Sequence, residues 1–397
     1  MFKKTIKNLL YFSTSSEVLL LFATLAALYI ANSALYEVYR DFLKNFLHIK
    51  LNFLNFAVDE KITLKFFIDD FLMAIFFLLI GLELKRELLV GELSTADKVF
   101  LPTIAAIGGV IAPALIFSYF NINAQDNLRG FAIPTATDIA FAYAVVKAFG
   151  NRISSATKVF IITLAVIDDL IAIFIIAFFY TEQLHALFLL YSFIVMFVLF
   201  LLSIKKSENL FFYTILGFLL WLCILQSGIH PSVSGVVLAM FIPFRTANQD
   251  FLENFAHNLA PFVNFFILPF FAFANAGVQI VNFSLQILYD PLIMGIVFGL
   301  FLGKQIGVVF FSFIAFKLKI CQLPKDCNWL EFYGVAILTG IGFTMSLFIG
   351  NLAFDSDEIL DKVKIAVLLG SSISFIFGSL ILLFVKKKEN IIEKILN

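Results

Sequence analysis

The sequence predicts an all-α polytopic membrane protein of about twelve transmembrane helices, and two observations support this prediction. Of the 397 residues, 61% are hydrophobic and only 14% are charged, whereas soluble domains carry about 25% charged residues. The apolar residues also stand in long runs, such as Val18 to Ile30 and Leu210 to Leu225. About 20 such residues in a helix cross the hydrocarbon core of a bilayer, whereas membrane β-strands alternate polar and apolar residues.

Twelve apolar segments follow one another along the chain. They cover residues 16–34, 64–90, 99–120, 130–149, 155–180, 184–204, 209–224, 228–243, 251–276, 290–316, 330–350 and 361–386. The seventh and eighth segments nearly touch. We expect the twelve to form a single transmembrane domain over residues 1–397.

The charges in the connections predict the orientation of these segments. Lys and Arg are concentrated in the connections on the side of the N-terminus, and such a bias marks the cytoplasmic side. We therefore expect both termini in the cytoplasm. No small-residue cleavage site follows the first apolar run, so we interpret that run as a retained helix. The formal net charge is +0 and gives no indication of nucleic-acid binding.

The long loop after the first segment contains two stretches that alternate polar and apolar residues, His48 to Phe53 and Lys61 to Phe66. This period of two predicts a small extracytoplasmic β-hairpin over residues 45–66. A lone hairpin is marginally stable in water. The hairpin therefore needs a partner surface, and pairing with the same hairpin of a second protomer, in a homodimer, is one way to supply it.

Two consecutive carboxylates, Asp168 and Asp169, lie midway through the fifth apolar segment. Ionisable side chains inside a bilayer are costly and are functional candidates by default. Adjacent residues on a helix point about 100° apart, so one carboxylate can face a buried partner while the other faces a water-filled cavity. Hard cations prefer oxygen ligands, so Na⁺ and protons are expected to compete for this pair, which is the chemistry of an exchanger.

The tenth segment holds one cation, Lys304, among small residues that allow another helix to approach closely. A buried lysine needs a counter-ion or it loses its proton. Either Asp168 or Asp169 can serve. A fixed structural ion pair and a part in transport both remain open.

Two segments carry features that break helices. The fourth contains Pro134, Thr137 and Asp138, and the eleventh contains Gly340 and Gly342. We expect Asp138 to lie near the exposed backbone amides of a break, as a helix cap, as part of an ion site, or as both. Interrupted segments at corresponding places in two halves indicate a transporter's binding site. Residues 99–180 and 290–386 are therefore predicted to be inverted repeats with discontinuous helices 4 and 11.

Five stretches of this sequence together resemble the bacterial NhaA-type sodium/proton antiporters. They are FFLLIGLELKRE at 76–87, PTATDIAF at 134–141, LAVIDD at 164–169, LPFFAFANAG at 268–277 and GIGFTMS at 340–346. The stretches recur in the family's order and cover nearly the whole chain. The resemblance implies a twelve-helix fold in which two broken helices cross near the midplane of the bacterial inner membrane.

The resemblance also implies roles for individual residues. Asp169 corresponds to the main cation and proton carboxylate, with Asp168 beside it and Lys304 as the lysine that pairs with an aspartate. Asp138 and Thr137 correspond to the crossing of the broken helices. Positions linked to the cytoplasmic funnel, the outer side or the pH response are matched by Asp70, Glu83, Lys85, Arg86, Glu87 and His230.

One position departs from the family's pattern. Ala256 stands where the family frequently has a pH-related glutamate, and Glu253 lies about one helical turn earlier. Glu253 and His257 share a helical face at the spacing i, i+4, and they are further candidates for a pH response. By resemblance, the protein exports Na⁺ or Li⁺ in exchange for protons, moves net charge, is active at alkaline pH and forms dimers.

Other functions fit the sequence less well. The aspartate pair and Lys304 would obstruct a channel. A sodium-coupled symporter of a small organic anion, the alternative that we retain, should have more polar or cationic residues at the midplane. An intramembrane aspartyl protease needs carboxylates that face each other, so we expect no enzyme. We expect no cofactor, and Na⁺ bound by Asp168 and Asp169 is the only metal ion predicted.

Overall fold

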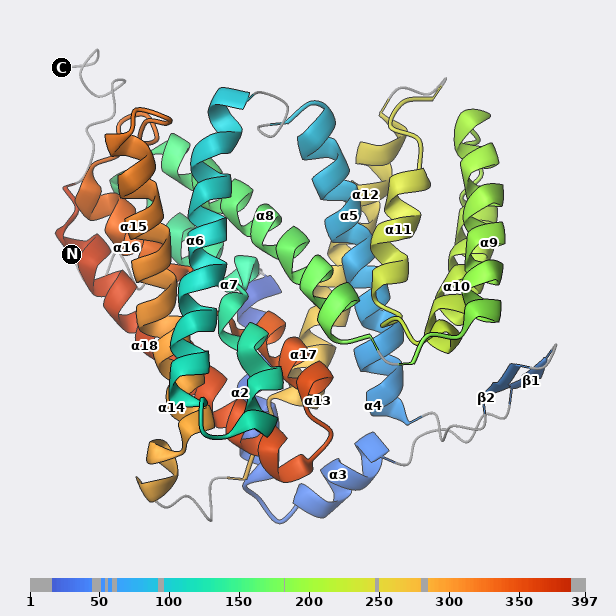
Figure 1. Ribbon diagram of the computed structural model, residues 1–397, viewed down its shortest axis with the longest axis horizontal. Helices are drawn as coiled ribbons and strands as arrows, with labels where there is room; N and C mark the ends of the chain where they lie inside the picture. The colour runs from blue at the N-terminus through green and yellow to red at the C-terminus, as the bar shows by residue number, and fades with distance from the viewer. Residues whose placement is uncertain are drawn as a thin grey trace. The chain divides into compact units, whose positions relative to one another are not determined.

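The computed structural model describes residues 16–44, 51–53, 56–58, 63–91, 96–181, 183–246, 250–279 and 285–386. The chain divides into two compact units, each built from separate stretches of sequence. Unit 1 comprises Met1–Val18, Glu87–Ile175 and Phe283–Asn397, and unit 2 comprises Leu19–Arg86 and Ile176–Asn282. Figure 1 shows that helices dominate both units.

Unit 1 contains the helices that carry the predicted carboxylates and Lys304. In chain order its elements are α6 (Ala96–Phe120), a 3-10 helix (Gln125–Thr135), α7 (Ile139–Ala148), a 3-10 turn (Gly150–Arg152), α8 (Ser155–Phe179, whose last turn belongs to unit 2), a 3-10 turn (Leu285–Tyr289), α14 (Pro291–Phe298), a π-helical turn (Gly299–Gly303), α15 (Lys304–Lys317), α16 (Trp329–Leu338), α17 (Phe343–Ala353) and α18 (Asp357–Phe384).

Unit 2 contains the remaining elements. They are α2 (Ser16–Ala31, whose first residues belong to unit 1), α3 (Tyr36–Lys44), β1 (Leu51–Phe53), β2 (Phe56–Val58), α4 (Leu64–Phe66), a π-helical turn (Phe67–Leu72), α5 (Met73–Leu89, which continues past the unit boundary), α9 (Ala186–Ile204), α10 (Leu210–Ser227), α11 (Val233–Phe241), α12 (Phe251–Phe262), a π-helical turn (Val263–Ile267) and α13 (Leu268–Asn275).

Within the described residues, eight helices are long and apolar enough to cross a membrane, or ten if each of two bent helix pairs counts as one span. A helix satisfies every backbone hydrogen bond internally, which hydrocarbon requires. Two predicted segments are not among these spans. The segment at 64–90 carries charged residues near both ends, including Asp69, Asp70 and the run from Glu83 to Glu87, and the segment at 228–243 contains only α11, which has nine residues. The count of twelve stays a prediction.

Close backbone contact holds α6 against α15 in unit 1. A Cβ atom added to Gly307 would lie 1.9 Å from the carbonyl oxygen of Gly108, so no side chain fits at that point. Small residues allow membrane helices to approach in this way. Apolar side chains from α6, α8, α15 and α16 fill the core beside this contact, among them Leu164 and Phe332. The helix that begins with Lys304 is thereby fixed beside α6.

In unit 2, α10 and α11 join through Gly228, which has a φ of +87°. Glycine adopts this left-handed conformation without strain and commonly ends a helix. The seventh and eighth predicted segments are divided at this residue. Buried side chains of α5, α9, α10 and α11, including Leu82 and Tyr213, form the core of this unit.

The strands β1 and β2 pair antiparallel, with Leu51 opposite Val58. They lie within residues 45–66, but the prediction of a second strand from Lys61 to Phe66 is wrong in its last three residues, because Leu64–Phe66 form the short helix α4 and β2 comes earlier in the chain. Residues 45–50, 54–55 and 59–62 of that prediction lie outside the described part of the chain, as do the N-terminal residues before Ser16 and the C-terminal residues after Lys386. The full hairpin and the location of the termini stay predictions.

Candidate ion-binding site

The two consecutive carboxylates lie midway along α8, in the interior of unit 1. Asp168 and Asp169 are each only 2% exposed. Their helix is apolar over most of its length, so the pair has little access to solvent water. Burying a charged carboxylate without a partner is strongly unfavourable, and the surroundings must therefore supply opposite charge, hydrogen bonds or protons.

Lys304 supplies the opposite charge, and the structure places it on Asp168 rather than on Asp169. Its Nζ atom donates to Oδ2 of Asp168 at 2.6 Å, and Lys304 is 0% exposed. The charge of Asp169 also acts on the same ammonium group. Gly109 of α6 lies beside the lysine, and a Cβ atom there would be in ordinary van der Waals contact with Nζ, at 3.8 Å.

Thr137 lies close to the same carboxylate. Its hydroxyl and backbone amide face Asp168, while the hydroxyl donates to the carbonyl oxygen of Thr339 at 2.9 Å. Among the described residues, the buried Oδ1 atom of Asp168 has no hydrogen-bond partner at normal geometry. Asp168 therefore offers one oxygen to Lys304 and keeps another that can accept from a proton or a cation.

Asp138 joins the two interrupted segments. It is the N-cap of α7, where its side chain accepts from the amide of Phe141 at 3.2 Å. Its other oxygen accepts from the amide and the hydroxyl of Thr344, in the first turn of α17. Its own amide donates to the carbonyl oxygen of Ile341 at 2.7 Å. One buried carboxylate thus caps two helix N-termini, where negative charge is favourable.

The structure shows where each interruption falls. The 3-10 helix ends at Thr135, after Pro134, and residues 136–138 have no helical structure before α7 begins at Ile139. In the eleventh segment, α16 ends at Leu338 and α17 begins at Phe343, with axes 42° apart. Thr137, Asp138, Asp168, Asp169 and Lys304 therefore belong to one cluster in unit 1.

A second set of predicted residues lies in unit 2. Oδ1 of Asp70 is 3.2 Å from Nε2 of His230, and both side chains are partly buried. Asp69, to which the sequence analysis assigned no role, accepts from the amide nitrogen of Asn275 at 2.6 Å. Asp69 and Asp70 lie in the π-helical turn before α5, and such turns are frequent at functional sites.

The charged residues at the end of α5 differ in their burial and in their contacts. Lys85 donates to the carbonyl oxygens of Met240 and Ile242, at 2.7 and 2.6 Å, and so satisfies the end of α11. Glu83 and Glu87 are partly buried, and Arg86 is exposed. On α12, Glu253 and His257 are both exposed.

The sequence analysis missed one buried carboxylate. Glu331 is 0% exposed and accepts from the amide of Ser154 at 2.8 Å and the hydroxyl of Thr157 at 2.7 Å, which ties α16 to the start of α8. In the sequence it lies three residues after the helix-capping residue Asn328, where a charged residue of a first helical turn is ordinary. Only the tertiary contact reveals that it is buried.

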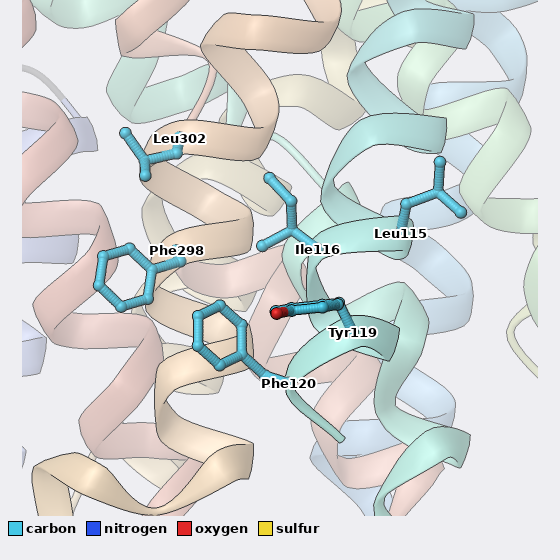
Figure 2. Close-up of a pocket in the computed structure, with 6 residues that line it drawn as sticks. All are labelled: Leu115, Ile116, Tyr119, Phe120, Phe298 and Leu302. Carbon is cyan, nitrogen blue, oxygen red and sulfur yellow. The ribbon is translucent and has the colours of Figure 1, made fainter. Parts of the chain in front are cut away.

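A pocket of about 390 Å³ in unit 1 contains none of these residues. Figure 2 shows its lining, in which the rings of Phe120 and Phe298 stack with centroids 5.3 Å apart. The lining carries no carboxylate and no amine, so it cannot hold Na⁺ by charge. Its residues are Leu115, Ile116, Tyr119, Phe120, Phe298 and Leu302.

The sequence is similar to known proteins over nearly its whole length. Residues 7–382 match the family model described as Na⁺/H⁺ antiporter 1. The chain is 45% identical to the Na⁺/H⁺ antiporter NhaA of Pelagibacter ubique, over 97% of this chain and 98% of that protein. It is 46% identical to Na⁺/H⁺ antiporter NhaA 1 of Syntrophotalea carbinolica, over 94% and 95%. Identity to NhaA 2 of Campylobacter jejuni subsp. doylei is 44%, over 96% and 99%.

Proposed function

The chain belongs to the Na⁺/H⁺ antiporter 1 family and is a multi-pass membrane transporter that exchanges Na⁺ for protons, and on this premise we propose that Asp168 and Asp169 form the site for which the two ions compete. The protein is not an enzyme. The comparisons do not support the alternative of a sodium-coupled symporter.

One observation carries the assignment of the site. Two adjacent carboxylates are almost fully buried, and Lys304 pairs with one of them, Asp168, while the charge of Asp169 acts on the same ammonium group. The charge of Lys304 offsets one carboxylate charge, and a proton or a cation that binds to Asp169 can offset another. Na⁺ and a proton cannot both occupy the same carboxylate oxygen, so binding of one expels the other.

This competition gives a transport cycle by alternating access. Asp169 takes up Na⁺ from the cytoplasm in its deprotonated form, with Asp138 and Thr137 beside the site. The site then opens to the other side, where protons displace Na⁺, and the protonated form returns. A further proton, carried by Asp168 or by Lys304, enters with the one on Asp169, so each cycle moves net charge. A transporter that loads Na⁺ only when deprotonated is activated as the pH rises.

The proposal includes the membrane arrangement. Twelve spans, with inverted repeats at 99–180 and 290–386 and discontinuous helices 4 and 11, place the site at the bilayer midplane. The protein lies in the bacterial inner membrane with both termini in the cytoplasm, transports Li⁺ as well as Na⁺, and needs no cofactor. It forms a homodimer through the 45–66 hairpin. Asp70, Glu83, Lys85, Arg86, Glu87, His230, Glu253 and His257 serve the funnel or the pH response.

Exchange is tested in inside-out membrane vesicles that have been energised to a stable pH gradient and that report acidity through a fluorescent amine. Addition of Na⁺ or Li⁺ is expected to collapse the gradient, because each ion drives protons out through the same site. Addition of K⁺ is expected to leave the gradient intact, which controls for leak. If no cation releases protons at neutral or alkaline pH, the exchange mechanism is wrong.

A further inference from the structure

The short helix α3 stands apart from the transport site and presents an apolar surface that no described residue covers. It follows α2, the helix of the first predicted segment, after a bend of 115°. Figure 1 shows α3 running across the direction of α5 rather than along it. With α2 along the membrane normal, a bend of 115° leaves α3 about 25° from the membrane plane, and a tilt of α2 by about 20° in the direction that favours the plane reduces this to about 5°.

The side chains of α3 divide into three sectors. With about 100° between successive residues, Tyr39 and Leu43 share one sector, and both are buried. Val38 and Phe42 share the neighbouring sector, together with Leu35 directly before the helix. These three are 66%, 44% and 54% exposed, respectively. The charged residues occupy the opposite side and are Glu37, Arg40, Asp41 and Lys44.

The buried sector prevents α3 from turning its apolar stripe inward. The hydroxyl of Tyr39 donates to the carbonyl oxygens of Phe273 and Ala274 at the end of α13. Its ring meets that of Phe273 edge-on, with centroids 5.3 Å apart. A Cβ atom on Gly277 would lie only 2.6 Å from the tyrosine oxygen. The tyrosine is therefore enclosed, and the neighbouring stripe of Leu35, Val38 and Phe42 is left exposed.

The charged sector indicates what kind of surface the helix contacts. Arg40 pairs with Glu37 and lies over the ring of Tyr36, 5.8 Å from its centroid. Two acidic and two basic residues leave this side with no formal net charge. Attraction to anionic lipid headgroups, which needs a basic cluster, is therefore not the basis of contact. Apolar burial is the remaining source of free energy.

We propose that α3 is an interfacial anchor whose Leu35, Val38 and Phe42 stripe inserts into the boundary between lipid headgroups and acyl chains. Amphipathic helices with a polar face opposite an apolar one lie in this plane and bury the apolar face about 5–10 Å deep. The bend from α2 and the enclosed Tyr39 favour the bilayer over a second copy of the chain. Through Tyr39, the anchor holds the end of α13, next to Asn275 and its hydrogen bond to Asp69.

The proposal goes beyond ion exchange and is tested without a transport assay. Cys223, Cys321 and Cys327 are replaced by serine in the full chain, and single cysteines are introduced as Val38→Cys and Phe42→Cys. Glu37→Cys and Asp41→Cys are the matched controls on the same helix. Each is labelled with a polarity-sensitive fluorophore and reconstituted into phosphatidylcholine vesicles. The vesicles contain lipid that carries a spin label either near the headgroup or near the methyl end of the acyl chain.

Labels at 38 and 42 are expected to be quenched at least about twofold more by the shallow spin label than by the deep one, as a shallow interfacial position requires. Labels at 37 and 41 should respond instead to aqueous iodide. Adding anionic lipid should change neither result. Equal quenching at all four positions overturns the proposal. The proposal is also overturned if the labels at 38 and 42 are protected from aqueous iodide only at a high protein-to-lipid ratio, because a second copy of the chain then covers the stripe. Leu35→Cys replaces either variant if it fails to fold.

Discussion

Asp169→Asn is expected to abolish Na⁺-driven proton movement in vesicles. The amide keeps the shape of the side chain but cannot bind a proton at neutral pH, and it provides one neutral oxygen in place of a charged carboxylate. Loss of one partner of a desolvated charge contact costs about 2–5 kcal/mol, and 1.4 kcal/mol is a factor of ten in affinity. We therefore expect apparent Na⁺ affinity to fall by about 100-fold, with no proton release on Na⁺ addition.

Asp355→Asn is the matched control for this variant. Asp355 is an exposed aspartate between α17 and α18, and the same change there should leave exchange near wild type. The two variants are compared at equal protein content in the vesicle membrane. A loss of less than tenfold in rate corresponds to a change of less than about 1.4 kcal/mol in the barrier. If Asp169→Asn therefore keeps more than about a tenth of the wild-type exchange rate, the carboxylate is not the central carrier.

Lys304→Met is expected to have the largest effect on stability. The substitution leaves Asp168 buried without its cation, and removal of one partner of a buried ion pair costs about 3–5 kcal/mol. Lys317→Met makes the same change at the exposed end of the same helix and should be nearly neutral. The free energy of unfolding is measured by denaturant titration of the detergent-solubilised protein, followed by the fluorescence of Trp221 and Trp329.

The double variant Lys304→Met/Asp168→Asn separates the ion pair from other contributions of the lysine. If the loss arises from an uncompensated carboxylate, removing that charge as well should recover most of the stability, because a buried pair replaced by neutral residues is often close to neutral. Double and single variants of equal instability would instead assign the loss to packing of the lysine side chain.

Much of the candidate site follows from local sequence, because charge inside a bilayer is rare and conspicuous. Asp168, Asp169, Asp138 and Lys304 stand out against apolar neighbours without any knowledge of the fold. The partner of Lys304 does not follow in the same way. Helical spacing places the two aspartates about 100° apart, but it does not determine which of them faces α15. Which aspartate faces α15 depends on how α6, α8 and α15 pack together, including the close contact between Gly108 and Gly307.

Other features depend on tertiary contacts that leave no local pattern. In the sequence Thr344 has the appearance of an ordinary helix residue, but in the structure its hydroxyl and its amide both donate to Asp138. Pro134 marks the fourth segment as interrupted, yet the chain leaves helical geometry two residues later. There the carbonyl oxygens of Ile341 and Thr339 in the eleventh segment accept hydrogen bonds from the amide of Asp138 and the hydroxyl of Thr137. The π-helical turn before Lys304 and the burial of Glu331 are likewise set by packing.

Competition between Na⁺ and protons for Asp168 and Asp169 is tested most directly by Na⁺ binding to the purified protein over a series of pH values. Calorimetry gives the apparent dissociation constant, and a pH indicator in weak buffer gives the protons released per Na⁺ bound. Protonated carboxylates cannot bind Na⁺, so the dissociation constant should rise as the pH falls, and by about tenfold per pH unit where one proton is displaced. A dissociation constant that does not change with pH, with no proton release, would contradict a shared site.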